Sequence, residues 1–332
     1  MIDKGSTLNS YTKRLFGQIF NDPNITEIVI NKIREIWIEK ESVWEKIESE
    51  NVSKENLTYF SNAAAAFSNN TLNDKTPILS ATMPNGERLQ IITPPACDDS
   101  QFSITIRKPN DRIFSLNDFK EKGFFDQVVI GEFIDENNKK LNTFLHQKDY
   151  QSFFELAVNC GTKNIVIAGA TGSGKTTFMK SLVVHIPHDE RLITIEDVRE
   201  IKSDVHHNMV NLLYPSEKQD IVSPTKLLKS CLRMKPDRIL LAELRGGETF
   251  DYINVISSGH GGSLTSIHAG SYDEAVRRLV SMAMQNETGQ NVPYDTLKEI
   301  VLQAIDVIAI IENHKGKRFI KSLHFKDYEG VK

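Results

Sequence analysis

Short apolar runs alternate with helical patterns through the C-terminal two-thirds of the chain. The runs that suit buried strands lie at residues 164–168, 191–197, 238–243 and 263–269. Because a strand in a parallel sheet is covered by helices on both faces, its sequence is apolar almost throughout. The alternation therefore predicts a parallel sheet with helices on both sides, which is an α/β fold.

The end of this region carries two more specific signals. Residues 271–283 open with Ser271 and Glu274, spaced as in a helix capping box, and continue with an apolar stripe at helical spacing. Residues 306–325 contain two apolar-rich runs around a turn at residues 315–316. These patterns predict a capped helix followed by a β-hairpin.

The first hundred or so residues have a different pattern. Strand-like alternation occurs at residues 36–40, 88–93 and 102–108, and a helical segment occurs at residues 55–69. This mixture predicts a small α+β domain over residues 1–108. Pro109 and Asn110 are turn formers that interrupt the pattern. We therefore expect a linker over residues 109–116 and a second domain over residues 117–332.

Composition and charge describe a folded protein with no bulk bias toward a membrane or a nucleic acid. Of the 332 residues, 39% are hydrophobic and 25% are charged, and the formal net charge is −4. Residues 1–110 hold 12 basic and 14 acidic side chains, so neither half of the chain is basic in bulk. Bulk charge does not exclude a local basic groove. No apolar run approaches the roughly 20 residues that span a bilayer. The three cysteines are far apart and suggest neither a disulfide framework nor a zinc site, so a cytosolic address is the default expectation.

The first apolar run is followed directly by the glycine-rich stretch GATGSGKTT. This stretch fits the phosphate-loop pattern GxxxxGK[ST], in which backbone N–H groups at the start of a helix surround the phosphates of a nucleotide. We expect ATP to be bound by Gly169, Ala170, Thr171, Gly172, Ser173, Gly174, Lys175, Thr176 and Thr177. In this pattern Lys175 reaches the β and γ phosphates, and the hydroxyl of Thr176 coordinates Mg²⁺.

Candidate groups for hydrolysis follow the other three runs. Glu243 ends the third run, and in α/β folds the carboxyl ends of strands face the ligand, so we interpret it as a carboxylate that acts near the metal or on water. A second acidic cluster, Glu196, Asp197 and Glu200, follows the second run, where acidic residues also commonly begin helices. His268 ends the fourth run and either senses the γ-phosphate through a hydrogen bond or serves a structural role.

Four of these stretches occur in an order that resembles the secretion ATPase superfamily. GATGSGKTT, ITIEDVREI, CLRMKPDRILLAELR and SGHGGSLTSIHAGS look like its phosphate loop, Asp box, second acidic motif and His box. Within that superfamily the chain is similar to the traffic ATPases of type IV secretion systems, also called DNA-transfer ATPases. The resemblance covers nearly the whole chain and extends weakly into the N-terminal domain at NGERLQI and SITIRKP.

The resemblance implies a RecA-like P-loop ATPase domain that follows the smaller N-terminal domain in the chain. It also implies a homo-hexameric ring that binds nucleotide between the two domains, with ATP and Mg²⁺ as cofactors. The expected location is cytoplasmic, peripheral at the inner membrane, with inner-membrane and other components of a secretion machine as partners. Direct binding of nucleic acid is left open, as are the cargo and the mode of membrane docking.

The resemblance further implies roles for individual residues. The implied catalytic residues are Lys175, Glu196, Glu243 and His268. Glu196 and Glu243 would join Thr176 at the metal, partly through water. Arg88 and Arg107 match N-terminal-domain arginines that approach the phosphates and couple hydrolysis to domain rotation, a role that suits the forked donors of a guanidinium group.

Two positions depart from the family pattern. Ala242 stands where a glycine usually precedes the glutamate of the second acidic motif, and Lys235 stands where relatives can carry arginine. The extra methyl group of alanine would interfere if the backbone needed a close approach or a positive φ at that point. Slower hydrolysis is the expected consequence in that case.

These observations favour an ATPase that converts hydrolysis into ring motion for type IV secretion, in substrate export or pilus biogenesis. The alternative within the superfamily is an ATPase for type II secretion or for type IV pilus assembly or retraction. Two alternatives come from other classes: a RecA-type nucleic-acid motor, and a non-hydrolysing nucleotide switch that builds a scaffold.

Overall fold

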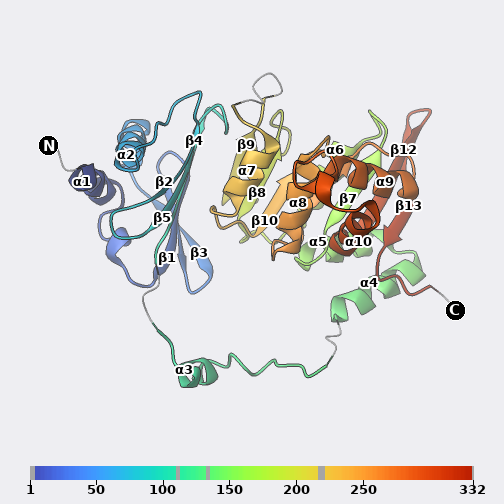
Figure 1. Ribbon diagram of the computed structural model, residues 1–332. Helices are drawn as coiled ribbons and strands as arrows, with labels where there is room; N and C mark the ends of the chain where they lie inside the picture. Colours follow the sequence, from blue (N-terminus) through green and yellow to red (C-terminus); the bar gives the residue numbers. More distant parts are fainter. Residues whose placement is uncertain (1–3, 110–112, 132–134, 216–220, 331–332) are drawn as a thin grey trace.

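The computed structural model describes residues 4–109, 113–131, 135–215 and 221–330. Figure 1 shows two bodies, each built on its own sheet, and a long connection between them that contains helix α3 (Leu116–Glu121). Within the described residues, no helix combines the length and the apolar character needed to cross a bilayer.

The N-terminal domain is a six-stranded antiparallel sheet backed by helices. Its elements are α1 (Lys4–Phe16), the 3-10 turn η1 (Ile19–Asn21), β1 (Ile25–Lys32), β2 (Glu35–Lys40), β3 (Val43–Glu48), α2 (Lys54–Phe67), β4 (Ile78–Thr82), β5 (Arg88–Ile92) and β6 (Gln101–Arg107). The strand order is β3-β2-β1-β6-β5-β4, and α1 and α2 lie side by side on one face (Figure 1). Phe60 of α2 is fully buried in one core with Ile28 and Ile104 of the sheet, so the α+β class predicted for this region is confirmed.

The C-terminal domain is built on a seven-stranded sheet. Its elements are α4 (Glu136–Gln147), α5 (Tyr150–Asn159), β7 (Ile165–Gly169), α6 (Lys175–Val183), β8 (Leu192–Glu196), β9 (Met209–Leu213), α7 (Pro224–Cys231), β10 (Arg238–Leu241), α8 (Glu248–Ser257), β11 (Leu264–Ile267), α9 (Tyr272–Ala283), the 3-10 turn η3 (Gly289–Asn291), α10 (Tyr294–Ala304), β12 (Val307–His314) and β13 (Lys317–Phe325). The strand order is β13-β12-β7-β11-β10-β8-β9. Every neighbouring pair is parallel except the β12–β13 hairpin.

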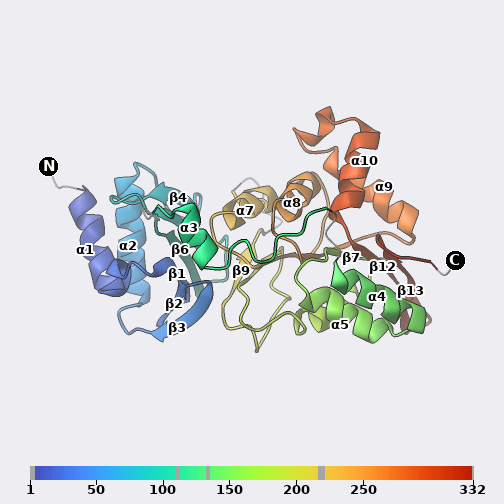
Figure 2. The same ribbon diagram turned by 90° about the horizontal axis from the view of Figure 1, so that it is seen from below.

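Helices cover both faces of this sheet, as predicted. Figure 2 shows α7, α8, α9 and α10 on one side and α4 and α5 on the other. Leu228 of α7 and Leu279 of α9 belong to the core on the first side, whereas Phe153 of α5 and Met179 of α6 belong to the core on the second. The sheet is thus buried on both faces, which explains why its strands read as nearly continuous apolar runs.

The two local signals near the C-terminus form as expected, with one difference. Lys315 and Gly316 both have positive φ, as a two-residue hairpin turn requires. Ser271 accepts a hydrogen bond from the N–H of Glu274 at 3.3 Å. The carboxylate of Glu274 accepts from the N–H of Gly270 instead of that of Ser271, so only half of the capping box forms.

The connection between the domains exposes large apolar side chains. Ile113 is 95% exposed and Ile130 is 98% exposed, and Phe124 between them is exposed as well. The first sheet ends at Arg107, and the helices that pack on the second sheet start at Glu136. We propose that the connecting segment continues past residue 116 to α4, and is therefore longer than the 109–116 linker expected from the sequence.

Polar side chains fill the contact between the two domains. Arg191 is fully buried and donates from Nη1 to Asn31 of β1 at 2.9 Å and to Asn208 at 2.6 Å. Burial lowers the pKa of this guanidinium to about 10. Lys235, whose φ is 52°, places its ammonium 2.9 Å from the carboxylate of Glu39 in β2. The lysine that departs from the family pattern therefore links the domains.

Glu27 of β1 lies beside this contact. Its carboxyl group is buried, and Nε of Arg107 approaches one oxygen at 3.4 Å. Burial raises the pKa of Glu27 to about 7, and the nearby charges of Arg107, Lys235 and Arg191 only partly offset that effect. An ionised carboxylate at this position is therefore unfavourable to the folded state.

Glu27→Gln is expected to stabilise the protein at alkaline pH. The pKa of Glu27 in the folded protein, about 7, lies above the ordinary value of 4.5. The free energy of unfolding therefore falls as the pH rises from about 4.5 through about 7. The full cost, about 3 kcal/mol, applies above that range. Urea unfolding at about pH 8 and about pH 4 tests this, because the gain should appear only at the higher pH. Glu50→Gln, at an exposed ion pair with Arg34, is the matched control; an equal effect of Glu27→Gln at both pH values would contradict the prediction.

Candidate active site

The phosphate loop connects β7 to α6. Gly174 has a φ of 101°, and α6 begins at the next residue, Lys175. A Cβ atom at Gly169 would lie 2.5 Å from the carbonyl oxygen of Ile311 and 2.5 Å from Oγ of Ser173. Glycine is therefore required both where β7 enters the loop and where the helix starts. The result is a helix N-terminus at the end of a buried strand, which is the arrangement that binds phosphate.

The side chain of Lys175 is folded back into this loop. Its Nζ donates to the carbonyl oxygens of Gly169 at 2.9 Å and Ala170 at 3.1 Å, and Nδ1 of His268 lies 3.4 Å away. Lys175 is only 8% exposed. Burial lowers the pKa of its ammonium, and the nearby carboxylate of Glu243 partly offsets that effect. The lysine charge is thus held at the mouth of the loop instead of extending into solvent.

A cavity of about 410 Å³ opens beside the loop, a size that suits a small ligand. One wall is the loop with the start of α6, and the other follows the ends of β8, β10 and β11, with one side chain from β13. The lining residues are Thr171, Gly172, Gly174, Lys175, Thr176, Thr177, Asp197, Val198, Glu200, Ala242, Glu243, Arg245, Ser266, His268 and Arg318. Of the predicted loop residues, Gly169, Ala170 and Ser173 support the loop without lining the cavity.

Glu243 lies on the wall opposite the phosphate loop, between a histidine and an arginine. Nε2 of His268 is 2.7 Å from one carboxylate oxygen of Glu243, and Nη2 of Arg245 is 2.7 Å from the other. Arg245 also reaches Asp197 at 2.7 Å. Burial lowers the pKa of the Arg245 guanidinium, but the two carboxylates raise it by more, so the net shift is upward. The predicted residues Lys175, Glu243 and His268 are therefore neighbours in the folded chain.

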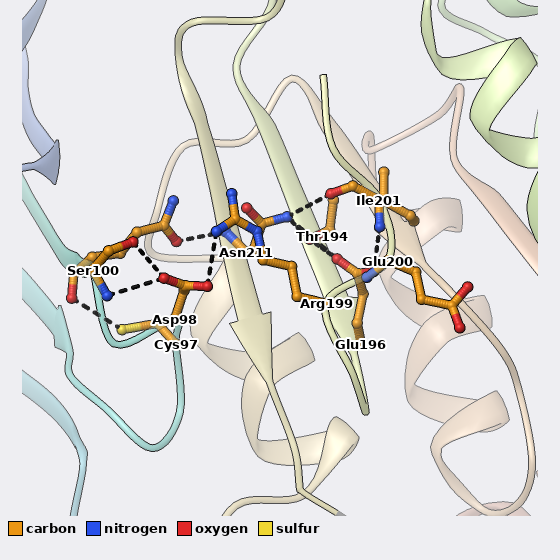
Figure 3. Close-up of polar contacts among 10 residues, drawn as sticks. Cys97, Asp98, Ser100, Thr194, Glu196, Arg199, Glu200, Ile201 and Asn211 are labelled. Atoms are coloured by element: carbon orange, nitrogen blue, oxygen red, sulfur yellow. Dashed lines mark hydrogen bonds and ion pairs between the residues drawn. The ribbon is translucent and has the colours of Figure 1, made fainter. Parts of the chain in front are cut away.

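Glu196 lies outside this cavity. It is fully buried, and its carboxylate accepts hydrogen bonds from the N–H groups of Glu200 and Ile201, each at 2.8 Å (Figure 3). The hydroxyl of Thr194 donates to its other oxygen at 2.7 Å. In this conformation Asp197 and Glu200, instead of Glu196, line the cavity. The catalytic and metal-binding role expected for Glu196 stays a prediction.

The two N-terminal arginines also lie away from the cavity in the single chain. Arg88 and Arg107 are direct cross-strand neighbours on β5 and β6. The guanidinium of Arg107 points to Glu27, and neither arginine lines the cavity. Their expected approach to the phosphates stays a prediction.

Ala242 fits its position without strain. Its φ is not positive, its N–H donates to the carbonyl oxygen of Ile195 at 3.0 Å, and its own carbonyl oxygen accepts from the hydroxyl of Ser266 at 2.7 Å. The backbone therefore does not need glycine here. The concern that the extra methyl group forces an unfavourable backbone at this point does not apply.

Two arginines of the cavity were not predicted. Arg245 follows Glu243 by two residues in the run LAELR, so its place at the strand end offered a local signal. Arg318 offered none, because it reaches the phosphate loop only through sheet pairing. β12 pairs with β7, and β13 then places Cδ of Arg318 3.0 Å from where a Cβ on Gly174 would lie.

The sequence pattern of the family described as "Type II/IV secretion system protein" matches residues 16–312. The chain belongs to this family. It is 45% identical over 303 residues to "Type IV secretion system protein VirB11" of Brucella suis biovar 1 (strain 1330), covering 89% of this chain and 84% of that protein. It is 40% identical over 310 residues to "Type IV secretion system protein PtlH" of Bordetella pertussis (strain Tohama I), covering 92% and 91% respectively.

A solved structure supports the same assignment. The crystal structure of the VirB11 ATPase from the Brucella suis type IV secretion system, in complex with sulphate, superposes with a TM-score of 0.91. The sequence identity is 41%, and the match covers 97% of this chain and 95% of that one. The resemblance predicted from the four motifs is thus confirmed, and so is the fold class, a RecA-like P-loop domain with a smaller α+β domain before it.

Proposed function

We propose that this chain is an ATPase of a type IV secretion system, which hydrolyses ATP with Mg²⁺ and converts the reaction into domain motion. The observation that carries the proposal is the cavity between the phosphate loop and the Glu243–His268 pair. The relatives at 40–45% identity are named as type IV secretion proteins, and the solved relative is named as an ATPase. These names favour type IV secretion over the type II and pilus alternatives.

The loop side of the cavity would hold the phosphates. The N–H groups at the start of α6 and the ammonium of Lys175 supply positive charge. The hydroxyl of Thr176 on this side, and the carboxylates of Asp197 and Glu200 from the opposite wall, are hard oxygen donors, which fit Mg²⁺. A bound Mg²⁺ would neutralise charge that develops on the phosphates.

The opposite wall would act on the attacking water. Glu243 has one oxygen against His268 and the other against Arg245, so its carboxylate is held facing the cavity. A carboxylate in this position can accept a hydrogen bond from water, orient it and take its proton. His268 lies between Glu243 and Lys175, so it can respond to a change at the phosphate.

Assembly into a homo-hexamer at the cytoplasmic face of the inner membrane is the second part of the proposal. The single chain leaves Ile113, Phe124 and Ile130 exposed in the connection between domains. Large apolar side chains gathered in one segment are typical of an interaction surface. Contacts with other subunits and with components of the secretion machine would cover them.

Hydrolysis is expected to depend on Mg²⁺ and to be carried by an oligomer. Phosphate release by the purified protein should fall to background when the metal is removed with EDTA and return when Mg²⁺ is added. Mass measurements in ATP and in ADP should show a six-fold assembly. Stimulation by single-stranded DNA that weakens steeply with salt would favour the nucleic-acid motor instead, and tight ATP binding without turnover under all conditions would favour the switch.

A further inference from the structure

A loop of the N-terminal domain covers the free edge of the C-terminal sheet. β9 is the last strand of that sheet. The N–H of Leu213 in β9 donates to the carbonyl oxygen of Ala96 at 2.9 Å, and Cys97 and Leu212 form an antiparallel bridge. The N–H of Asn211 donates to Oε1 of Gln101 at 3.1 Å. The loop over residues 96–101 therefore continues the sheet across the domain boundary.

The side chain of Asn211 connects the covered edge of the sheet to buried residues of the C-terminal domain. Its Nδ2 donates to the hydroxyl of Thr194 at 2.8 Å and to the carbonyl oxygen of Ile201 at 3.1 Å (Figure 3). The Thr194 hydroxyl in turn donates to Glu196. Asn211, Thr194 and Glu196 are all buried. Buried polar groups that are connected in this way resist rearrangement, because breaking one bond leaves its partner unsatisfied.

Glu196 fixes the fold of the acidic segment that follows β8, which we call the acidic loop (residues 197–201). Its carboxylate accepts both the N–H of Glu200 and the N–H of Ile201. The loop therefore wraps around a buried carboxylate. Its outer surface, with Asp197 and Glu200, lines the nucleotide cavity.

Arg199 connects the acidic loop to the N-terminal domain. Its Nη1 donates to Oδ2 of Asp98 at 2.8 Å, so a side chain next to Glu200 is bonded to the loop that covers β9. Figure 3 shows Glu200 pointing away from Asp98. Hydrogen bonds from Ser100, together with the nearby Arg199, keep the pKa of Asp98 below its ordinary value despite burial. Asp98 is thus ionised and fixed in place when it meets Arg199.

We propose that the Arg199–Asp98 ion pair positions the acidic loop for hydrolysis and transmits movement between the N-terminal domain and the nucleotide cavity. The inference rests on the proposed ATPase function. If the N-terminal domain moves relative to the C-terminal domain, the pair either breaks or pulls the acidic loop with it. If the pair holds, the carboxylates of Asp197 and Glu200 change place relative to the phosphate loop, and if it breaks, the acidic loop loses its connection to the N-terminal domain. Neither Arg199 nor Asp98 lines the cavity.

The test compares Arg199→Gln, Asp98→Asn and the double variant in the full-length protein. Each single variant should lower kcat about tenfold while the affinity for ATP stays within about twofold, because the pair orients the loop without binding phosphate. The double variant should be no worse than either single one, since both remove the same contact. Arg199→Lys, which keeps the charge, should recover part of the loss, and Arg34→Gln, at an exposed ion pair in the N-terminal domain, is the matched control.

A second measurement does not depend on turnover. Hydrogen–deuterium exchange with Mg²⁺ and a non-hydrolysable ATP analogue should show slower exchange in the wild type at the acidic loop and at residues 96–101. In Arg199→Gln, the analogue should still slow exchange at the acidic loop but should no longer slow it at residues 96–101. Wild-type kcat in Arg199→Gln and Asp98→Asn, or unchanged transmission in the exchange experiment, would overturn the inference. A wild type that binds ATP without hydrolysing it would instead overturn the proposed function, while the exchange experiment would still decide whether the pair transmits movement.

Discussion

Glu243→Gln is expected to lower kcat for ATP hydrolysis by about 10²–10³-fold, with ATP still bound. Glutamine has nearly the shape of glutamate and can keep the contact with the His268 ring. It cannot take a proton from water, and it brings no negative charge toward a metal. Lys175 and the start of α6, which would bind the phosphates, lie on the opposite wall and are unchanged.

Single-turnover hydrolysis and equilibrium ATP binding, measured side by side, separate the two effects. Glu287→Gln, an exposed glutamate of the same domain, is the matched control and should behave as the wild type. Glu243→Gln should also assemble in ATP as the wild type does, because the substitution leaves the fold intact. Undiminished hydrolysis in Glu243→Gln would remove Glu243 from the reaction and direct attention to Asp197 and Glu200 on the same side of the cavity.

The parts of the site that the sequence predicted are those set by local chain geometry. The phosphate loop needs an apolar strand, glycines and a helix start in succession, and all three are adjacent in the chain. Glu243 follows its strand directly, and parallel strands bring their carboxyl ends to one edge. Position along the chain therefore determines position in space for these groups, and Lys175, Glu243 and His268 are neighbours in the fold.

The parts that sequence did not predict depend on contacts between distant segments. β9 went unrecognised because Asn211 interrupts its apolar run, and the reason for a buried asparagine appears only when Thr194 and Glu196 lie beside it. Glu196 is one of three acidic residues in close succession, and nothing local indicates which of them turns inward. Asn211 of β9, which donates to Glu196 at 3.3 Å, decides it together with the backbone N–H groups of Glu200 and Ile201.

Gly262, one of the glycines that precede His268, is a further example of a residue whose requirement depends on a distant segment of the chain. Arg238, at the start of β10, is buried, and its Nη1 donates to the carbonyl oxygens of Val158 and Gly262, each at 3.1 Å. Nη2 donates to Glu190 at 3.0 Å. Gly262 has a φ of 73°, and a Cβ atom there would overlap Nη1 of Arg238. Glycine at this position thus makes room for a buried guanidinium that ties three segments together.

Arg238→Met is expected to destabilise the C-terminal domain by about 3 kcal/mol or more, although methionine fills much of the same volume. The carbonyl oxygens of Val158 and Gly262 would be left buried without a donor, and Glu190 would lose its counter-ion. Glu190→Gln should cost less, because Glu190 is partly exposed and water can replace its partner. Urea unfolding followed at the C-terminal domain measures both, with the exposed Arg233→Met as a control expected to stay within about 0.5 kcal/mol. An Arg238→Met protein as stable as the wild type would mean that the domain gains nothing from this cluster, and that the glycine at position 262 is required by its positive φ alone.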